Sequence, residues 1–426
     1  MTSMKLGSRG APVAFLQTAL VRAGFLTGPP GAVFDDRMRG AVVAFQRSRG
    51  LRVDGIAGPI TQGALRRWQL GSVRHSIRRG DSFFSLARRY GSSIPAIETA
   101  NPGADPLHLR LGSSLTIPLG FDVVPVDIPY SSAVVNACVC GLKARYPFLQ
   151  TGELGRSVTG EKIPWLSFGA GPRQVLYTAA HHANEWITTP VLLKYVEELC
   201  EAHATGGRVF GYEAAVIGKT ATLCVAPLIN PDGVNLVTGA RTEDSWYRDA
   251  AAFAGHYPDI PFPSGWKANI RGVDLNLQYP AGWQEARKLK FAQGFTLPGP
   301  RDYVGEAPLT APEALALYAF TRRTNPALVL AFHTQGQVIF WKYLDIEPPG
   351  ARALGERFVG TSGYELEDVP FASGFAGYKD WFIDEYNRPG YTIEAGIGEN
   401  PLPIEQFTQI YADNRGILTL AAMDEG

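Results

Sequence analysis

Apolar residues in the first part of the chain recur at helical spacing. Between residues 4 and 68 they fall three or four positions apart, so that they share one face of a helix. The first helix would bury Val13, Leu16, Leu20, Val21 and Phe25. Glycines and prolines at 28–31 interrupt it, and the spacing resumes in two further helices, at 36–49 and 61–70. We therefore expect a small three-helix domain within residues 1–70.

A second pattern occupies residues 74–119, where short apolar stretches of strand and helix period follow one another. The predicted elements are, in chain order, a strand at 75–77, helices at 83–90 and 94–98, and a strand at 111–118. Asp81 or Ser82 would cap the first of these helices, because both side chains accept hydrogen bonds from free backbone amides. This order predicts a βααβ module.

The remainder of the chain, residues 130–426, alternates strands with helices and follows a linker at 120–129 that is rich in Pro and Val. Continuous apolar runs, which are typical of strands buried on both faces, occur at 175–180, 221–229, 327–332 and 391–393. An apolar stripe from Ile187 to Leu199 marks one of the helices between them. We expect an α/β fold in which helices cover both faces of a sheet, and ligands bind beyond the carboxyl ends of the strands.

The composition is that of a soluble globular chain. Of the 426 residues, 45% are hydrophobic and 19% are charged, which is enough for at least one sizeable core. Lys and Arg together number 40, as do Asp and Glu, so we expect neither a nucleic-acid partner nor a polybasic membrane contact. No apolar run approaches the roughly 20 residues of a membrane span. The first residues lack the apolar core of a signal peptide. We therefore expect either an origin in the cytoplasm, including that of a mother cell or forespore, or a leader that has been removed, or export by another route.

Polar side chains that can bind a metal stand at the ends of three apolar runs. His182 and Glu185 follow the first, His333 follows another, and Glu394 follows the last. Two imidazoles and one carboxylate are the donors of a catalytic zinc site whose fourth position stays open to water, and a second carboxylate nearby can accept the proton of that water. The spacing of His182 and Glu185 alone is weak evidence, and His181 is an alternative to His182. The combination predicts one Zn²⁺ ion in the catalytic domain.

In order and context these segments resemble the zinc carboxypeptidase (carboxypeptidase A-like) family. The likeness covers essentially all of residues 130–426 and rests on His182-Ala183-Asn184-Glu185-Trp186, Asn230-Pro231-Asp232-Gly233, Gly272-Val273-Asp274-Leu275-Asn276, His333 and Glu394. The resemblance implies a mixed sheet, His182, Glu185 and His333 as zinc ligands, and Glu394 as catalytic base. It also implies that Asp274 orients His182. For the basic group that stabilises the oxyanion, Lys267 fits better by its separation from Asp274 in the chain, and Arg248 is the alternative.

Departures from the family pattern concern the substrate. Exopeptidases of the family carry an Arg after the Asn of the Asp274 motif, where it binds the terminal carboxylate of the substrate, but here Leu277 follows Asn276. The Tyr of the family's flap is replaced by Phe371-Ala372-Ser373, and Tyr378 is a candidate substitute. Lys379 matches the floor of the pocket for the residue after the scissile bond and favours an anionic side chain there, unless it extends to solvent. We expect Asn276, Lys379 and Gln335 to bind substrate.

The two N-terminal segments resemble modules that bind cell wall. The helical segment resembles the peptidoglycan-binding domain through Gly7-Ser8-Arg9-Gly10, Phe45-Gln46 and Asp54-Gly55-Ile56-Ala57-Gly58. Residues 75–118 resemble a LysM domain through Arg79-Gly80-Asp81-Ser82, Asn101-Pro102 and Leu115-Thr116-Ile117-Pro118. The resemblance implies binding to glycan strands of peptidoglycan.

A pocket that favours an anionic side chain, together with modules that bind cell wall, indicates that the substrates are peptidoglycan stem peptides. In these, γ-linked D-glutamate keeps a free α-carboxylate, and meso-diaminopimelate carries a carboxylate on its side chain. The patterns Trp266-Lys267-Ala268-Asn269, His333-Thr334-Gln335-Gly336 and Asn400-Pro401-Leu402-Pro403 look like those of γ-D-glutamyl-L-diamino-acid endopeptidases. We therefore expect a zinc peptidase that cleaves the γ-D-glutamyl–meso-diaminopimelate bond at the cell wall, outside the cell or on a spore.

Two other functions compete with this one. The first is a carboxypeptidase that trims C-terminal residues from cell-wall peptides, against which Leu277 argues. The second is a wall-binding protein with an inert catalytic domain, against which the full set of metal ligands and Glu394 argue.

Overall fold

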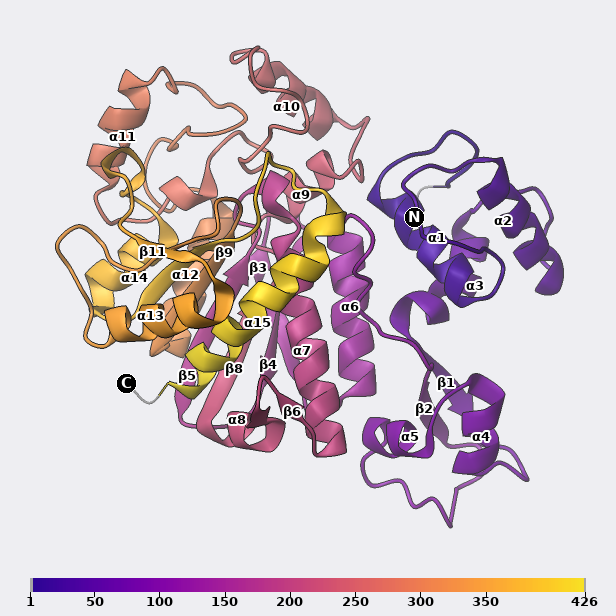
Figure 1. Ribbon diagram of the computed structural model, residues 1–426. Coiled ribbons are helices and arrows are strands. Elements are labelled where there is room, and N and C mark those ends of the chain that lie inside the picture. Colours follow the sequence, from indigo (N-terminus) through magenta and orange to yellow (C-terminus); the bar gives the residue numbers. More distant parts are fainter. Residues whose placement is uncertain (1–2, 425–426) are drawn as a thin grey trace. The chain divides into compact units, whose positions relative to one another are not determined.

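The computed structural model describes residues 3–424 (Figure 1). Contacts between residues divide this part of the chain into two compact units. The first comprises residues up to 129 together with 133–150, and the second comprises residues 130–132 together with those from 151 onward. None of the helices within residues 3–424 combines the length and the apolar character that a membrane span requires.

The first unit begins with the predicted three helices, α1 (Ala11–Arg22), α2 (Asp36–Ser48) and α3 (Pro59–Leu70). They enclose a common apolar core that includes Leu16, Met38, Phe45 and Leu65. The side chain of Asp35 accepts a hydrogen bond from the backbone amide of Met38 and so begins α2, because the first amides of a helix have no partner within it. The prediction of a small helical domain is confirmed.

The βααβ module follows in the same unit. Its strands β1 (Ser72–Ser76) and β2 (Ser114–Pro118) pair antiparallel, and between them lie α4 (Phe83–Tyr90) and α5 (Ile94–Ala100). Ser82 caps α4 and exchanges hydrogen bonds with Ser85. Asn101 holds the end of α5 to β2, because its side chain donates to the carbonyl of Thr116 and accepts from the amide of Thr116. The unit then includes most of α6 (Ser132–Arg145).

The second unit is built on one mixed sheet of eight strands within the described residues. Their order across the sheet is β11 (Glu365–Glu367), β10 (Val338–Phe340), β12 (Gly390–Glu394), β9 (Leu328–His333), β5 (Arg173–Ala179), β8 (Ala221–Ala226), β4 (Lys162–Phe168) and β3 (Gln150–Arg156). The central strands β12, β9, β5 and β8 are parallel to one another, whereas β10 and β4 run antiparallel to their central neighbours. A separate ribbon joins β6 (Arg208–Val209) to β7 (Tyr212–Glu213).

Helices cover both faces of this sheet, as predicted. Leu176 packs in one apolar cluster with residues of α12 (Pro312–Thr324) and α14 (Tyr378–Tyr386). The next residue, Tyr177, points the other way, because side chains alternate along a strand, and its hydroxyl donates to the carbonyl of Leu418 in α15 (Phe407–Met423). In Figure 1, α15 and α7 (Thr188–Thr205) lie in front of the sheet. The remaining helices are α8 (Ala214–Thr220), α9 (Pro231–Val237), α10 (Ser245–Ala254), α11 (Trp283–Ala292) and α13 (Ala351–Ser362).

Candidate metal centre and active site

The strand register brings the predicted polar residues to one edge of the sheet. In the parallel pair β12–β9, Glu394 stands opposite His333, and both are the last residues of their strands. In the pair β5–β9, Ala179 stands opposite Phe332, so the segment that follows β5 starts at the same level. That segment carries His182 and then the short helix Ala183–Glu185. The carboxyl ends of three neighbouring strands therefore supply the site.

His182, Glu185 and His333 form a cluster that can hold a metal ion. Their donor atoms lie within 4.8 Å of one another, and all three residues are buried. Nδ1 of His182 is 2.9 Å from Oε1 of Glu185, Nδ1 of His333 is 2.9 Å from Oε2 of the same carboxylate, and the two Nδ1 atoms are 3.2 Å apart. A tetrahedral ion bound at about 2.1 Å keeps its donors roughly 3.4 Å apart, so two imidazoles and a carboxylate in this arrangement fit zinc.

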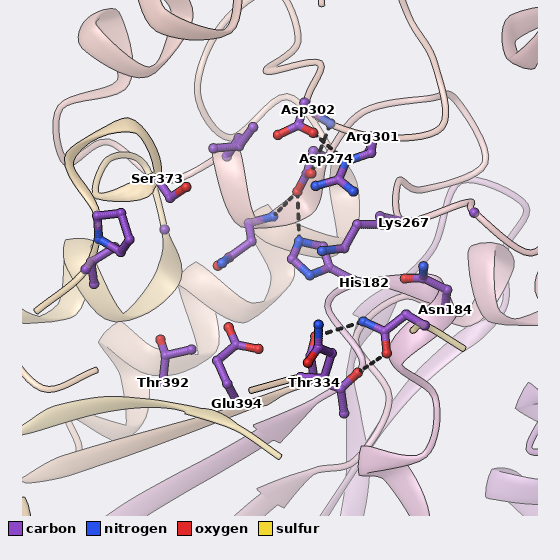
Figure 2. A pocket seen from close by; sticks show the side chains of 18 of the residues that line it. His182, Asn184, Lys267, Asp274, Arg301, Asp302, Thr334, Ser373, Thr392 and Glu394 are labelled. Atoms are coloured by element: carbon purple, nitrogen blue, oxygen red, sulfur yellow. Dashed lines mark hydrogen bonds and ion pairs between the residues drawn. The ribbon is translucent and has the colours of Figure 1, made fainter. Parts of the chain in front are cut away.

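Asp274 fixes the orientation of His182. Its Oδ1 lies 3.1 Å from Nε2 of His182, on the side of the ring that faces away from the other donors. The Asp274 carboxylate is held in turn by the backbone amides of Asn276 and Asp302 (Figure 2). A carboxylate on the second ring nitrogen of a metal-binding His selects the tautomer that leaves Nδ1 free for the metal. Asp274 therefore lies within hydrogen-bond distance of His182, the ring that the resemblance pairs it with.

Lys267 and Glu394 face the same cavity of about 700 Å³. Nζ of Lys267 is 3.0 Å from Oε1 of Glu185. Burial opposes the charge on Lys267, but the negative charges of Glu185, Asp274 and Glu394 together outweigh it and raise the pKa of Lys267, so the side chain stays cationic. Burial raises the pKa of Glu394 above its ordinary value, although the neighbouring His333 works in the other direction. A carboxylate of increased basicity is suited to accept a proton.

His182 and not His181 belongs to the cluster. The ring of His181 is fully buried and stacks on that of His333, with their centroids 5.5 Å apart. Burial lowers the pKa of His181 well below its ordinary value, so this ring is neutral. His181 therefore packs beneath the cluster, and the alternative assignment of His181 as the ligand is not supported by the geometry.

The motif Asn230-Pro231-Asp232-Gly233 joins the segments that carry these residues. The side-chain amide of Asn230 donates to the carbonyls of His181, Lys267 and Ala268, and its oxygen accepts from the amide of Gly233. A Cβ atom on Gly233 would lie 2.6 Å from the carbonyl oxygen of Ala268, so only glycine fits there. The motif thus links the loop that carries His181 to the loop that carries Lys267 and Ala268, and none of its side chains lines the cavity.

The predicted substrate-binding residues Asn276, Lys379 and Gln335 all line the cavity, together with Leu277 and Ser373. Lys379 is only 3% exposed, so it does not extend to solvent. Its Nζ donates to the carbonyl of Lys342 and lies 2.5 Å from Oδ1 of Asp380. The cavity wall therefore presents a lysine and an aspartate side by side.

Two further candidates lie elsewhere. Arg248 is exposed, donates to the carbonyl of Glu243, and is not among the residues that line the cavity, so the placement favours Lys267 as the basic group. Tyr378 is fully buried, and its hydroxyl shares a hydrogen bond with Thr321 in the core. Tyr378 is therefore not a substitute for the flap tyrosine.

Sequence reasoning missed Arg301 and Asp302, which form the wall of the cavity next to Lys267 (Figure 2). They belong to an irregular segment whose Pro300 carbonyl accepts from the amides of Lys267 and Ala268. No periodicity or motif marks such a segment in the sequence. Only the basic and acidic character of the pair, adjacent to two glycine- and proline-rich turns, could have drawn attention to it.

Comparisons with known proteins agree with this geometry. The sequence profile described as zinc carboxypeptidase matches residues 135–415, that of the peptidoglycan binding domain matches residues 9–65, and that of the LysM domain matches residues 75–118. A protein named gamma-D-glutamyl-L-diamino acid endopeptidase 1, from Lysinibacillus sphaericus, is 45% identical over 276 residues, which are 65% of this chain and 68% of that protein. The uncharacterized protein YqgT of Bacillus subtilis (strain 168) is 40% identical over 338 residues, which are 79% of this chain and 86% of that protein.

Among solved structures, carboxypeptidase A from Helicoverpa armigera has a similar fold. The TM-score is 0.54 at 16% sequence identity, and the match covers 94% of this chain and 90% of that chain. Bovine thrombin-activatable fibrinolysis inhibitor matches with a TM-score of 0.53 at 16% identity, over 70% of this chain and 98% of the other. At this identity the likeness concerns the fold alone.

Proposed function

From the premise that this chain belongs to the zinc carboxypeptidase family, we propose that it hydrolyses the γ-D-glutamyl–meso-diaminopimelate bond of peptidoglycan stem peptides. The observation that carries the proposal is the 45% identity to a protein named gamma-D-glutamyl-L-diamino acid endopeptidase 1. The peptidoglycan-binding and LysM segments support it, because they give the chain two modules for the polymer that contains this bond.

In this proposal His182, Glu185 and His333 hold one zinc ion through their clustered donor atoms. Zinc, when bound, supplies a Lewis acid for the scissile carbonyl and lowers the pKa of water. Asp274 keeps His182 in the tautomer that the ion requires.

Glu394 is the general base and acid of the proposed reaction. It accepts a proton from the attacking water and returns a proton to the amine of diaminopimelate as the amide bond breaks. Lys267 stabilises the negative charge that develops on the carbonyl oxygen, since its ammonium group faces the cavity, is charged and is held beside Glu185. Water adds to the acyl side, and the products are a γ-carboxylate and a free amine.

The cavity favours an endopeptidase of this type over a carboxypeptidase. Leu277 occupies the position where a terminal carboxylate would require an arginine, and an apolar side chain makes no such hydrogen bond. Lys379 and Asp380 lie together in the wall, and they complement the amino and carboxylate groups at the end of the diaminopimelate side chain. Asn276 and Gln335 are the uncharged contacts we assign to the peptide.

We propose that the N-terminal modules hold the enzyme at the cell wall, in the extracellular space or on a spore. They raise the local concentration of stem peptides without adding contacts at the catalytic centre. The glycan strands are thus the binding partner of these modules, and the stem peptides are the partner of the cavity.

The test is digestion of purified L-Ala–γ-D-Glu–meso-diaminopimelate, with products identified by mass spectrometry. We expect L-Ala–γ-D-Glu and free diaminopimelate. The variant Glu394→Gln should lose turnover while it keeps zinc and binding to insoluble peptidoglycan. Release of C-terminal residues from ordinary peptides would overturn the proposal in favour of a carboxypeptidase. Equal behaviour of the wild type and Glu394→Gln would show that the protein is only a wall-binding module.

A further inference from the structure

Arg301 is the cation of the cavity wall whose hydrogen-bonding capacity is used least. The three lysines that line the cavity each lie against a carboxylate, in the pairs Lys267–Glu185 (3.0 Å), Lys290–Asp302 (2.6 Å) and Lys379–Asp380 (2.5 Å). Arg301 uses only Nε, which donates to Oδ2 of Asp302 at 2.6 Å. Its two terminal nitrogens have no hydrogen-bond acceptor among residues 3–424, and the side chain is 45% exposed.

Asp302 holds the guanidinium group of Arg301 in one orientation and is itself held by Lys290. Asp302 receives Nε of Arg301 on one carboxylate oxygen and Nζ of Lys290 on the other. The backbone amide of Asp302 donates to Asp274, so the segment is tied to the carboxylate that orients His182. Burial lowers the pKa of Arg301, but the charges of Asp302 and Asp274 outweigh this and raise it, so the group stays charged. A charged, planar fork with free donors matches the geometry of a carboxylate.

The position of Arg301 assigns it to one side of the scissile bond. In Figure 2, Arg301 lies next to Lys267, and Glu394 lies on the opposite side of His182. On the proposed function, Glu394 protonates the leaving amine and Lys267 faces the carbonyl oxygen. The acyl part of the substrate therefore extends from the carbonyl toward Arg301.

We propose that Arg301 binds the free α-carboxylate of the γ-linked D-glutamyl residue and so selects γ-glutamyl acyl groups. The inference rests on the proposed function and adds to it a specificity-determining residue on the acyl side. In a γ-linked glutamyl residue three carbons separate this carboxylate from the scissile carbonyl, whereas an α-linked peptide with an uncharged residue before the scissile bond offers only a neutral backbone amide on that side. Asp302 is a positioning residue for Arg301, since it acts through the guanidinium group and not on the substrate.

The experiment compares two synthetic peptides that differ in one group. The first is L-Ala–γ-D-Glu–meso-diaminopimelate, and in the second the α-carboxylate of the glutamyl residue is an amide. A hydrogen bond to a charged group corresponds to about 10–100-fold in kcat/KM. The wild type should therefore cleave the amidated peptide about 10–100-fold more slowly. Arg301→Gln should lose a similar factor on the acidic peptide and should cleave both peptides at nearly the same rate.

Controls separate this inference from the proposed function. Arg248→Gln removes an exposed arginine outside the cavity and should keep the preference of the wild type. Zinc content and the melting temperature of Arg301→Gln show that the variant is folded, and Arg301→Lys, which keeps the charge without the fork, should restore part of the preference. If Arg301→Gln still prefers the acidic peptide by the factor of the wild type, the inference is wrong while the proposed function stands. If the wild type cleaves neither peptide, both fail.

Discussion

Asn230 provides a sharp test of how the site is held together. Replacing it with alanine removes the amide that joins the carbonyls of His181 and Ala268 and the acceptor of the Gly233 amide. Lys267 loses less, because its carbonyl also accepts from the amide of Ala183. In the described part of the chain, the carbonyls of His181 and Ala268 accept a hydrogen bond from no other donor.

The magnitude follows from the number of groups left without a partner. Two carbonyls and one amide become unsatisfied in a region that is fully buried, and each costs about 1–3 kcal/mol, so Asn230→Ala should lose about 3–9 kcal/mol of unfolding free energy. This is a large part of the roughly 5–15 kcal/mol that stabilises a typical domain. The variant should also bind zinc more weakly, because the loops that carry His182 and Lys267 are no longer joined.

Urea unfolding followed by tryptophan fluorescence measures the loss. Asn230→Asp is the informative companion, since it has the same shape but cannot donate and would place a carboxylate against carbonyl oxygens. It should be at least as unstable as Asn230→Ala near pH 7, and it should recover as the pH falls and the carboxyl is protonated. Asn136→Ala, at a half-buried position in α6, should change little. If Asn230→Asp is as stable as the wild type, donation by the Asn230 amide does not hold the loops, and the reasoning is refuted.

Three other outcomes are expected. Burial raises the pKa of Glu313 from its ordinary 4.5 to about 7. Between these two pH values the folded chain keeps a proton that the unfolded chain has released. The free energy of unfolding should therefore fall as the pH rises from 4.5 to 7, by about 3 kcal/mol in all. From pH 5 to pH 8 the wild type should lose about 2–3 kcal/mol of unfolding free energy relative to Glu313→Gln, which has no group that titrates at this position. A difference between the two proteins that stays constant over this range would contradict the raised pKa of Glu313. Asp274→Ala should weaken zinc binding by about 10–100-fold in a competition assay with a chelating dye, because His182 loses its orienting carboxylate, and an unchanged affinity would exclude that role. Gly233→Ala should lower stability by about 1–3 kcal/mol in thermal unfolding, since the new methyl group meets the Ala268 carbonyl, and a variant with the melting temperature of the wild type would show that the loop yields easily.

The central strands of the fold could be predicted because they are buried on both faces. A strand such as β5 has no solvent-facing side, so its apolar run is continuous and visible in the sequence. The edge strands β3 and β11 left no such signal, because both are largely polar and partly exposed and β11 has only three residues. Their pairing depends on neighbours far away in the chain, which a local pattern does not contain.

The metal donors could be predicted for a similar reason, since each follows a strand that the pattern reveals. Arg301 could not, because its place is decided by backbone pairing. The carbonyl of Pro300 accepts hydrogen bonds from the amides of Lys267 and Ala268, and the amide of Asp302 donates to Asp274. These backbone contacts position a loop that has no sequence motif at the cavity. Tyr378 shows the opposite case. Its hydroxyl and its place next to Lys379 made it a candidate for the active site, but its side chain points into the core.

The position of β12 in the sheet has a consequence for biosynthesis. This strand is inserted between β10 and β9 although it is the last strand within residues 3–424, and it ends in Glu394. A nascent polypeptide that has left the ribosome only as far as β11 thus carries all three residues of the cluster that can hold a metal ion, but it lacks Glu394 and the strand that joins β10 to β9. The proposed hydrolysis, which needs Glu394, can therefore begin only after translation has passed β12.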